Sequence, residues 1–218
     1  VIMPIGDHLR DVMDLYGSPK CPHTNAVLIA AGEKGVDINC HVEDDCGPSS
    51  SIRSMSPLGI GPVLKDRSAI NIGLVSCISY LDDKGFGPSL VHRNGVTRAR
   101  MFQEITIAQQ TDCSDDAALA AALDQLEATL NSPLGNMKGD YCVGQYTLAD
   151  CAWAGVCQVA TNMGKGTAVS SRSAVNNWFA AVQSHPSTSK EAINPFSCLS
   201  TKADHDSNSM RDVRINTA

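Results

Sequence analysis

The sequence has no long apolar segment, no concentration of basic residues and no spacing typical of a bound metal. Its longest uninterrupted apolar run, from Ala117 to Leu123, has seven residues, whereas a membrane-spanning helix needs about 20. The 17 Lys and Arg residues are scattered and are outnumbered by 23 Asp and Glu residues, so a surface that follows a phosphate backbone is not expected. We therefore expect no membrane span and no nucleic acid partner.

Cysteine is abundant, but its pattern excludes two kinds of site. There is no Cys-x-x-Cys pair and no Cys/His set at zinc spacing, so neither a dithiol redox centre nor a metal site is predicted. The odd count and irregular spacing argue against a disulfide framework and indicate a reducing compartment. Because the sequence begins with Val1, we expect that a leader was removed, with cytoplasm and organelle both open. The nine cysteines are Cys21, Cys40, Cys46, Cys77, Cys113, Cys142, Cys151, Cys157 and Cys198.

The hydrophobic pattern changes along the chain and predicts two domains of different class. Residues 1–81 mix short β-like runs with helical runs and predict an α/β domain. Residues 82–94 contain glycine, proline and scattered charge, as a linker does. Residues 95–199 follow the helical period and predict an all-α domain. The polar segment 200–218 has no periodicity and is expected to be a draped or loosely ordered tail.

Within the first domain, the order strand, helix, strand predicts a βαβ unit with parallel strands and a right-handed crossover. The elements expected there are a strand at 12–15, a helix from Pro22, a strand at 38–42, a hairpin of 63–64 with 69–72, and a helix at 74–81. The helices expected in the second domain are 96–110, 115–130, one that Thr147 opens, and one containing 174–182.

Cys21 is the one cysteine whose local sequence predicts reactivity. Pro22 follows it, and proline is favoured at the first position of a helix, so Cys21 is expected at the N-cap. Free backbone N–H groups and the positive end of the helix dipole favour the thiolate form of a cysteine placed there. Lys20 and His23 lie alongside in the sequence. An ordinary thiol at a small N-cap residue is the alternative interpretation.

Four sequence segments together resemble the glutathione transferases. They are residues 15–22 (LYGSPKCP), 33–37 (EKGVD), 56–64 (SPLGIGPVL) and 146–150 (YTLAD). The resemblance covers about positions 12 to 195. It implies a thioredoxin-like N-terminal domain followed by a helical C-terminal domain, with glutathione as a cosubstrate.

The resemblance also assigns individual residues. It implies a cis peptide bond at Pro62, in a loop that includes Gly61 and presents backbone groups to glutathione. At the start of the following helix, where the family has an acidic residue and a serine that bind the γ-glutamyl group, this sequence has Gly73 and Leu74. Only backbone groups remain there, and one lost charge-assisted hydrogen bond is worth about 1.5–3 kcal/mol. A degenerate glutathione site is therefore expected.

The same resemblance assigns Thr147 and Asp150 to a structural capping box, in which each side chain bonds the other residue's N–H group. This spacing explains Asp150 without a catalytic role. The pair is expected to stabilise the start of a helix in the second domain.

Three functions remain open on the sequence. Gly73 and Leu74 favour a weakly active or noncatalytic structural subunit that binds a protein partner or forms a homodimer. Cys21 followed by Pro22 favours a cysteine-type glutathione-dependent transferase or thiol transferase. A third function, binding of a small hydrophobic ligand between the domains, rests on the fold alone.

Overall fold

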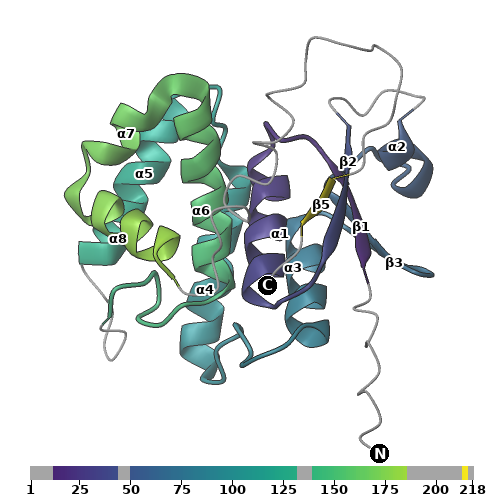
Figure 1. The fold of residues 1–218 in the computed structure, drawn as a ribbon. Helices are drawn as coiled ribbons and strands as arrows, with labels where there is room; N and C mark the ends of the chain where they lie inside the picture. The colour runs from purple at the N-terminus through teal and green to yellow at the C-terminus, as the bar shows by residue number, and fades with distance from the viewer. Residues whose placement is uncertain (1–11, 44–49, 132–138, 186–212, 216–218) are drawn as a thin grey trace, which may run out of the picture.

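The computed structural model describes residues 12–43, 50–131, 139–185 and 213–215. A mixed β-sheet with its helices lies beside a group of helices, and α1 and α6 run next to each other where the two parts meet (Figure 1). This arrangement confirms the predicted fold class. The limits of the predicted domains, at residues 81, 94 and 199, stay a prediction.

The sheet has the strand order β4-β3-β1-β2-β5. The strands are β1 (Met13–Gly17), β2 (Ile38–Val42), β3 (Val63–Asp66), β4 (Ala69–Ile72) and β5 (Val213–Ile215). β1 and β2 are parallel, as the βαβ interpretation requires, and the other neighbouring pairs are antiparallel.

Strand β5 lies in the segment 200–218, which was predicted to be a draped or loosely ordered tail. Its three residues pair with the outer edge of β2, and Ile38 lies opposite Ile215. A run of three residues is too short for period-two alternation to identify a strand. Its pairing depends on an open sheet edge that is distant in the sequence.

Three helices accompany the sheet: α1 (Pro22–Glu33), α2 (Ser51–Met55) and α3 (Leu74–Lys84). Leu15 and Met13 alternate with half-buried residues along β1, so the apolar face of the strand lies in the core with α1 and α3. The single turn α2 lies between β2 and β3 in the sequence. Its N-cap is Ser50, whose hydroxyl accepts a hydrogen bond from the Arg53 N–H group (3.1 Å).

The helical part contains α4 (Gly95–Gln110), α5 (Asp116–Asn131), α6 (Leu148–Ala160), a π-helical turn η1 (Thr161–Lys165), α7 (Gly166–Ser170) and α8 (Ser173–Gln183). Every residue of α6 is buried, because α6 packs between α1 and the other helices. A β-carbon at Gly155 would lie 2.4 Å from the Pro22 carbonyl oxygen. Glycine therefore permits the close approach of α6 to the first turn of α1.

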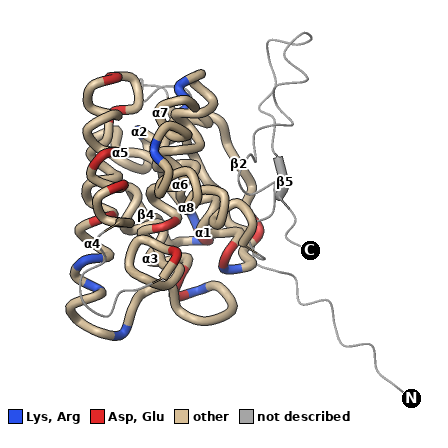
Figure 2. Tube along the Cα trace, turned by 90° about the vertical axis from the view of Figure 1, so that its left-hand side faces the viewer, with Lys and Arg blue, Asp and Glu red and all other residues tan. Residues whose placement is uncertain are grey.

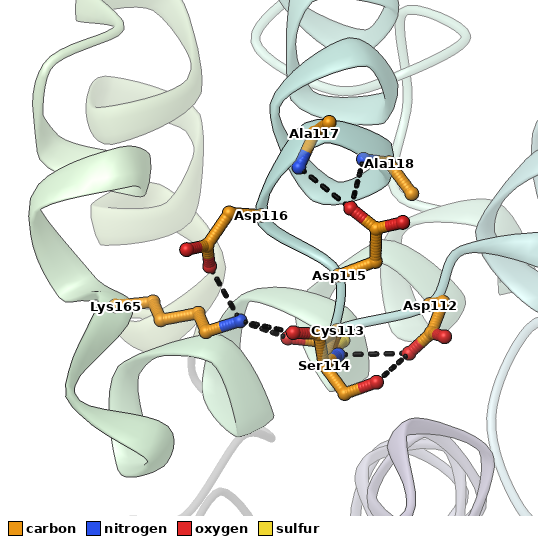
Figure 3. A network of polar contacts seen from close by, with 8 residues as sticks. All are labelled: Asp112, Cys113, Ser114, Asp115, Asp116, Ala117, Ala118 and Lys165. Carbon is orange, nitrogen blue, oxygen red and sulfur yellow. Dashed lines mark hydrogen bonds and ion pairs between the residues drawn. The ribbon is translucent and has the colours of Figure 1, made fainter.

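Lys165 joins η1 to the loop between α4 and α5 (Figure 3). Its ammonium group donates to the carbonyl oxygens of Cys113 and Ser114, each at 2.8 Å, and pairs with the Asp116 carboxylate at 2.6 Å. Asp115 accepts from two N–H groups of the first turn of α5. These contacts hold the α4–α5 loop against the end of α6.

A buried ion pair connects the end of α1 to the end of α3. The Lys34 ammonium lies 3.1 Å from the Asp82 carboxylate, and both side chains are 2% exposed. The Lys34 ammonium also donates to the Pro88 carbonyl oxygen (3.0 Å). Asp82 accepts from the Leu90 N–H group (2.7 Å) and the Ser89 hydroxyl (2.6 Å). The helix α3 thus continues into the segment 82–94 that was predicted as a linker. The ion pair and its hydrogen bonds hold in place the chain that follows α3.

Asp150 lies at the start of α6, where it forms a capping box with Thr147. One carboxylate oxygen accepts from the Thr147 N–H group (2.8 Å) and hydroxyl (3.1 Å). The other accepts from the Cys142 N–H group (3.0 Å) and the Trp178 indole (2.8 Å). Burial raises the pKa of Asp150, although these donors oppose the shift. Asp150 therefore joins α6, α8 and the segment before α6.

Candidate functional site

Three chain segments meet at one end of the sheet, and the strand register places them there. Tyr16 pairs with Val63, and Val63 pairs with Ile72. The next row of the sheet therefore contains Gly17, Pro62 and Gly73. These residues follow Tyr16, precede Val63 and follow Ile72, respectively. The turn that leads to Cys21 begins at this edge, so the sequence-predicted residues of the first domain share one region. Thr147 and Asp150 lie in the helical part and are structural.

Cys21 occupies the N-cap of α1 with extended backbone dihedrals (φ −91°, ψ 121°), and Pro22 follows at the first helical position. Its side chain makes no capping hydrogen bond within the described residues. The Cys21 N–H group bonds the Ser18 carbonyl oxygen (3.0 Å), which closes the turn after β1. Cys21 as a residue is partly exposed.

The other described cysteines are buried thiols. Burial raises the pKa of Cys77 to about 12 and that of Cys113 to about 11. Burial likewise raises the pKa of Cys142, Cys151 and Cys157. A thiol that is neutral and covered is a poor nucleophile. Cys46 and Cys198 lie outside the described residues, and Cys21 is the candidate nucleophile within them.

Asn25, four residues after Cys21, was missed as a site residue by the sequence analysis. It is buried in α1 at 2% exposure, and its side-chain amide donates to the Pro19 and Cys21 carbonyl oxygens, each at 2.9 Å. An asparagine on the buried side of a helix was the available signal, because a buried amide needs partners.

His23 links this turn to the helical part. Its Nε2 lies 2.9 Å from the Gln109 carbonyl oxygen near the end of α4. A carbonyl oxygen can only accept, so Nε2 carries the proton. Burial lowers the pKa of His23, and the bond to Gln109 opposes this shift. The neutral ring therefore connects α1 to α4 beside Cys21.

The peptide bond between Gly61 and Pro62 is cis, the geometry that the resemblance implied. The Pro62 carbonyl oxygen accepts a hydrogen bond from the Gly73 N–H group (2.8 Å). A β-carbon at Gly61 would lie 3.3 Å from the Ile52 side chain. The close approach of α2 to this loop therefore explains why glycine suits position 61.

Gly73 is the N-cap of α3, with a left-handed φ of 80° that favours glycine. Leu74 follows at 1% exposure, inside the hydrophobic core. The side chain of Leu74 packs inward and is not presented to a ligand at this edge of the sheet. The pair therefore offers a ligand only the backbone at the start of α3.

Within the described residues, no group of three or more His, Cys, Asp or Glu side chains could hold a metal ion. Likewise, none of the helices in these ranges combines the length and apolar character of a membrane-spanning segment. On the face drawn in Figure 2, basic and acidic positions are interspersed along the helices.

Solved structures share this architecture. A delta-class glutathione transferase from Nilaparvata lugens superposes with a TM-score of 0.69 at 21% identity, over 84% of this chain and 93% of the other. The chain has the glutathione transferase fold. Two curated relatives support the resemblance, although no family model matches the chain.

Both relatives are described as stringent starvation protein A homologues. The Coxiella burnetii protein is 31% identical over 91 residues, which are 42% of this chain and 44% of that protein. The Pasteurella multocida protein is 26% identical over 152 residues, which are 65% of this chain and 72% of that protein. The match spans less than half the length of the first relative.

Proposed function

We propose that this protein uses the glutathione transferase fold as a noncatalytic or weakly active assembly subunit. The observation that carries the proposal is the start of α3. Gly73 has no side chain, and Leu74 is buried in the core, so no polar side chain from this pair is available for the γ-glutamyl group.

The residues at this position fit glutathione poorly. A charged amine and carboxylate need charge-assisted partners, and each such hydrogen bond contributes about 1.5–3 kcal/mol. The loss of a single such hydrogen bond lowers the affinity for glutathione by about tenfold or more. Backbone N–H groups at the start of α3 retain some attraction for an anion.

An exposed apolar surface supports a role through protein contacts. Ile70 and Ile72 lie on one face of the edge strand β4, with 46% and 37% of their surface exposed, and Leu58 is 80% exposed. Ile60 is 49% exposed and lies 3.7 Å from the β-carbon position of Gly73. An apolar surface of this kind is typical of an interaction site. We propose a protein partner or a second copy of the chain there.

Calorimetric titration of the full chain with reduced glutathione tests the degenerate site. We expect no saturable binding up to about 1 mM, because the γ-glutamyl group meets only backbone donors. A dissociation constant of about 1 mM or tighter would contradict the proposal. A glutathione transferase with the acidic residue and serine in place serves as the positive control.

A second candidate function is thiol–disulfide exchange by Cys21. Its support is the partly exposed position of Cys21 at the N-terminus of α1. In this reaction the Cys21 thiolate attacks one sulfur of a substrate disulfide and forms a mixed disulfide. The other sulfur leaves as a thiolate and takes up a proton, so no further oxidant is needed.

The free thiols found throughout the described residues support a reducing compartment, cytoplasmic or organellar.

For this second function we expect one fast-reacting thiol with Ellman's reagent. The background variant is Cys46→Ser with Cys198→Ser, which removes the two thiols that the structure does not describe. Cys21→Ala in this background should abolish the fast phase, while Cys77→Ala should leave it unchanged because Cys77 is buried. A fast phase that persists in Cys21→Ala would exclude Cys21 as the nucleophile.

A further inference from the structure

Strand β4 is an open edge of the sheet. The strand order places it at one end, with β3 on one side and no further strand from the described residues on the other. The Gly73 N–H group, directly after β4, donates to the Pro62 carbonyl oxygen (2.8 Å) and so points toward β3. Backbone groups alternate in direction along an antiparallel strand, so those of Asn71 also point toward β3. The N–H and C=O groups of Ile70 and Ile72 therefore point outward, away from the sheet.

The composition of this edge favours pairing with another strand. Natural sheets protect open edges with charged residues, prolines or bulges, because free backbone groups bind other strands. The sequence of β4 is Ala-Ile-Asn-Ile, which has no charge and no proline. Its register with β3 runs without a bulge over the whole strand. Figure 1 shows β3 on the side of the molecule away from α5, α7 and α8.

Asn71, in the middle of β4, has a side-chain amide that lacks a partner. Its Oδ1 accepts a hydrogen bond from the Ser76 hydroxyl (3.5 Å). Its Nδ2 is buried and has no hydrogen-bond acceptor among the described residues. A buried polar group without a partner requires an explanation. The residue opposite on β3 is Leu64, whose side chain offers no acceptor.

We infer that a second copy of the chain pairs with β4, antiparallel to it, across a twofold axis at Asn71. In this register Ile70 lies opposite Ile72 of the second copy, and their outward backbone groups form hydrogen bonds in both directions. The inference rests on the proposed function as an assembly subunit. It deepens that function because it names the partner and the strand that binds it.

The strand is self-complementary in this register. Every outward N–H group of Ile70 and Ile72 meets an outward C=O group, and the exposed isoleucine side chains meet isoleucine, so no charge is buried. Each Asn71 amide, after rotation about its Cβ–Cγ bond, donates from Nδ2 to Oδ1 of Asn71 of the second copy. A register centred on Ile72 would instead place Ile70 opposite Leu74, which already belongs to α3. The register centred on Asn71 therefore uses the whole strand.

The size of this contact predicts a weak dimer. Specific, stable dimers bury about 1,200–2,000 Å² of total surface. Two edges of four residues each, with Ile60 near the end of the strand, reach at most the lower end of this range. The population of the dimer should therefore depend strongly on protein concentration.

Sedimentation velocity of the full chain tests the association. We expect the average mass to rise from that of a monomer at about 5 µM toward that of a dimer at about 200 µM. Ile72→Lys places a charge in the apolar contact and should lower the association constant by about tenfold or more. Val96→Lys is the matched control, because Val96 is an exposed apolar residue on α4, and it should change nothing. A monomer at all concentrations, or an equal loss in Val96→Lys, would overturn the inference.

Cysteine cross-linking tests the register itself. In a background with Cys21, Cys46 and Cys198 replaced by serine, Asn71→Cys should form a disulfide-linked dimer when about 200 µM protein is oxidised with diamide. The reason is that Cα atoms of opposite residues at a non-hydrogen-bonded position are about 4.5 Å apart, which a disulfide can span. In Ala69→Cys the two thiols would lie about 13 Å apart along the strands and should not cross-link. A folded Asn71→Cys variant without a linked dimer, or equal linking of Ala69→Cys, would overturn the inference.

These outcomes are distinct from those of the glutathione titration. A chain that stays monomeric and binds no glutathione would contradict the pairing of β4 and leave the degenerate site standing. A chain that cross-links through position 71 and binds glutathione at about 1 mM or tighter would support the pairing and contradict the degenerate site.

Discussion

Replacing Lys34 by methionine is expected to destabilise the protein by about 3–5 kcal/mol, the usual cost of leaving one member of a buried ion pair without its partner. Lys34 and Asp82 are 2% exposed and 3.1 Å apart, so solvent would reach the remaining carboxylate poorly. The Pro88 carbonyl oxygen would also lose its donor. Guanidinium denaturation monitored by circular dichroism measures the change in the free energy of unfolding.

Two further variants separate charge from packing. Lys84→Met removes an exposed lysine of α3 and should change the free energy of unfolding by about 0.5 kcal/mol or less. The double variant Lys34→Met with Asp82→Leu replaces both charges by apolar groups and should recover much of the loss. An equal loss in Lys34→Met and Lys84→Met would show that the pair is not buried in solution.

The effect of Lys34→Met should depend on pH. Burial alone would raise the pKa of Asp82, but the Leu90 and Ser89 donors and Lys34 outweigh it and lower this pKa below 3.8. A carboxyl group whose pKa is lower in the folded state than in the unfolded state stabilises the fold at pH values above its unfolded-state pKa. This contribution disappears as the pH falls through the folded-state pKa. The difference between the wild-type protein and Lys34→Met should therefore shrink below about pH 4.

Replacing Asp150 by alanine is expected to cost about 3–5 kcal/mol, more than the roughly 0.5–2 kcal/mol of an ordinary N-cap. The reason is that the carboxylate serves the Cys142 N–H group and the Trp178 indole as well as Thr147. Each buried donor left without an acceptor costs about 1–3 kcal/mol. Urea denaturation monitored by tryptophan fluorescence measures the loss.

A double-mutant cycle checks that these contacts form one network. Thr147→Val removes the hydroxyl bond and should cost about 1 kcal/mol. Combined with Asp150→Ala it should add almost nothing, because residues that share one network are not additive. Asp116→Ala, at a largely exposed carboxylate, should have a small effect. Additive losses at Thr147 and Asp150 would contradict the capping network.

Features that depend on neighbouring residues were predictable from the sequence. Pro22 placed the start of α1 and so assigned Cys21 to an N-cap. The turn residues before position 69 predicted a hairpin strand at 69–72, which are the observed limits of β4. Thr147 and Asp150 stand at the spacing of a capping box, which the structure contains. In each case the cause lies within a few residues of the effect.

Features that depend on distant residues were not predictable. The partner of Lys34 is 48 positions away in the sequence, and an exposed lysine was the ordinary expectation. Leu74 looks like a residue facing a ligand until α3 is packed on the sheet, which turns its side chain into the core. The Asn25 side chain reaches its acceptor on Pro19 only when the turn before it has folded back over the start of the helix.

The contact at Gly155 bears on how such a protein can evolve. The Pro22 carbonyl oxygen and the Ala26 N–H group stand within 3 Å of the β-carbon that any other residue would place there. Any larger residue would push α6 away from the first turn of α1, the turn that begins with Cys21. Exchange of the helical half with that of a relative therefore requires a residue without a β-carbon at this position. The two halves are separate in architecture, but they are constrained to change together.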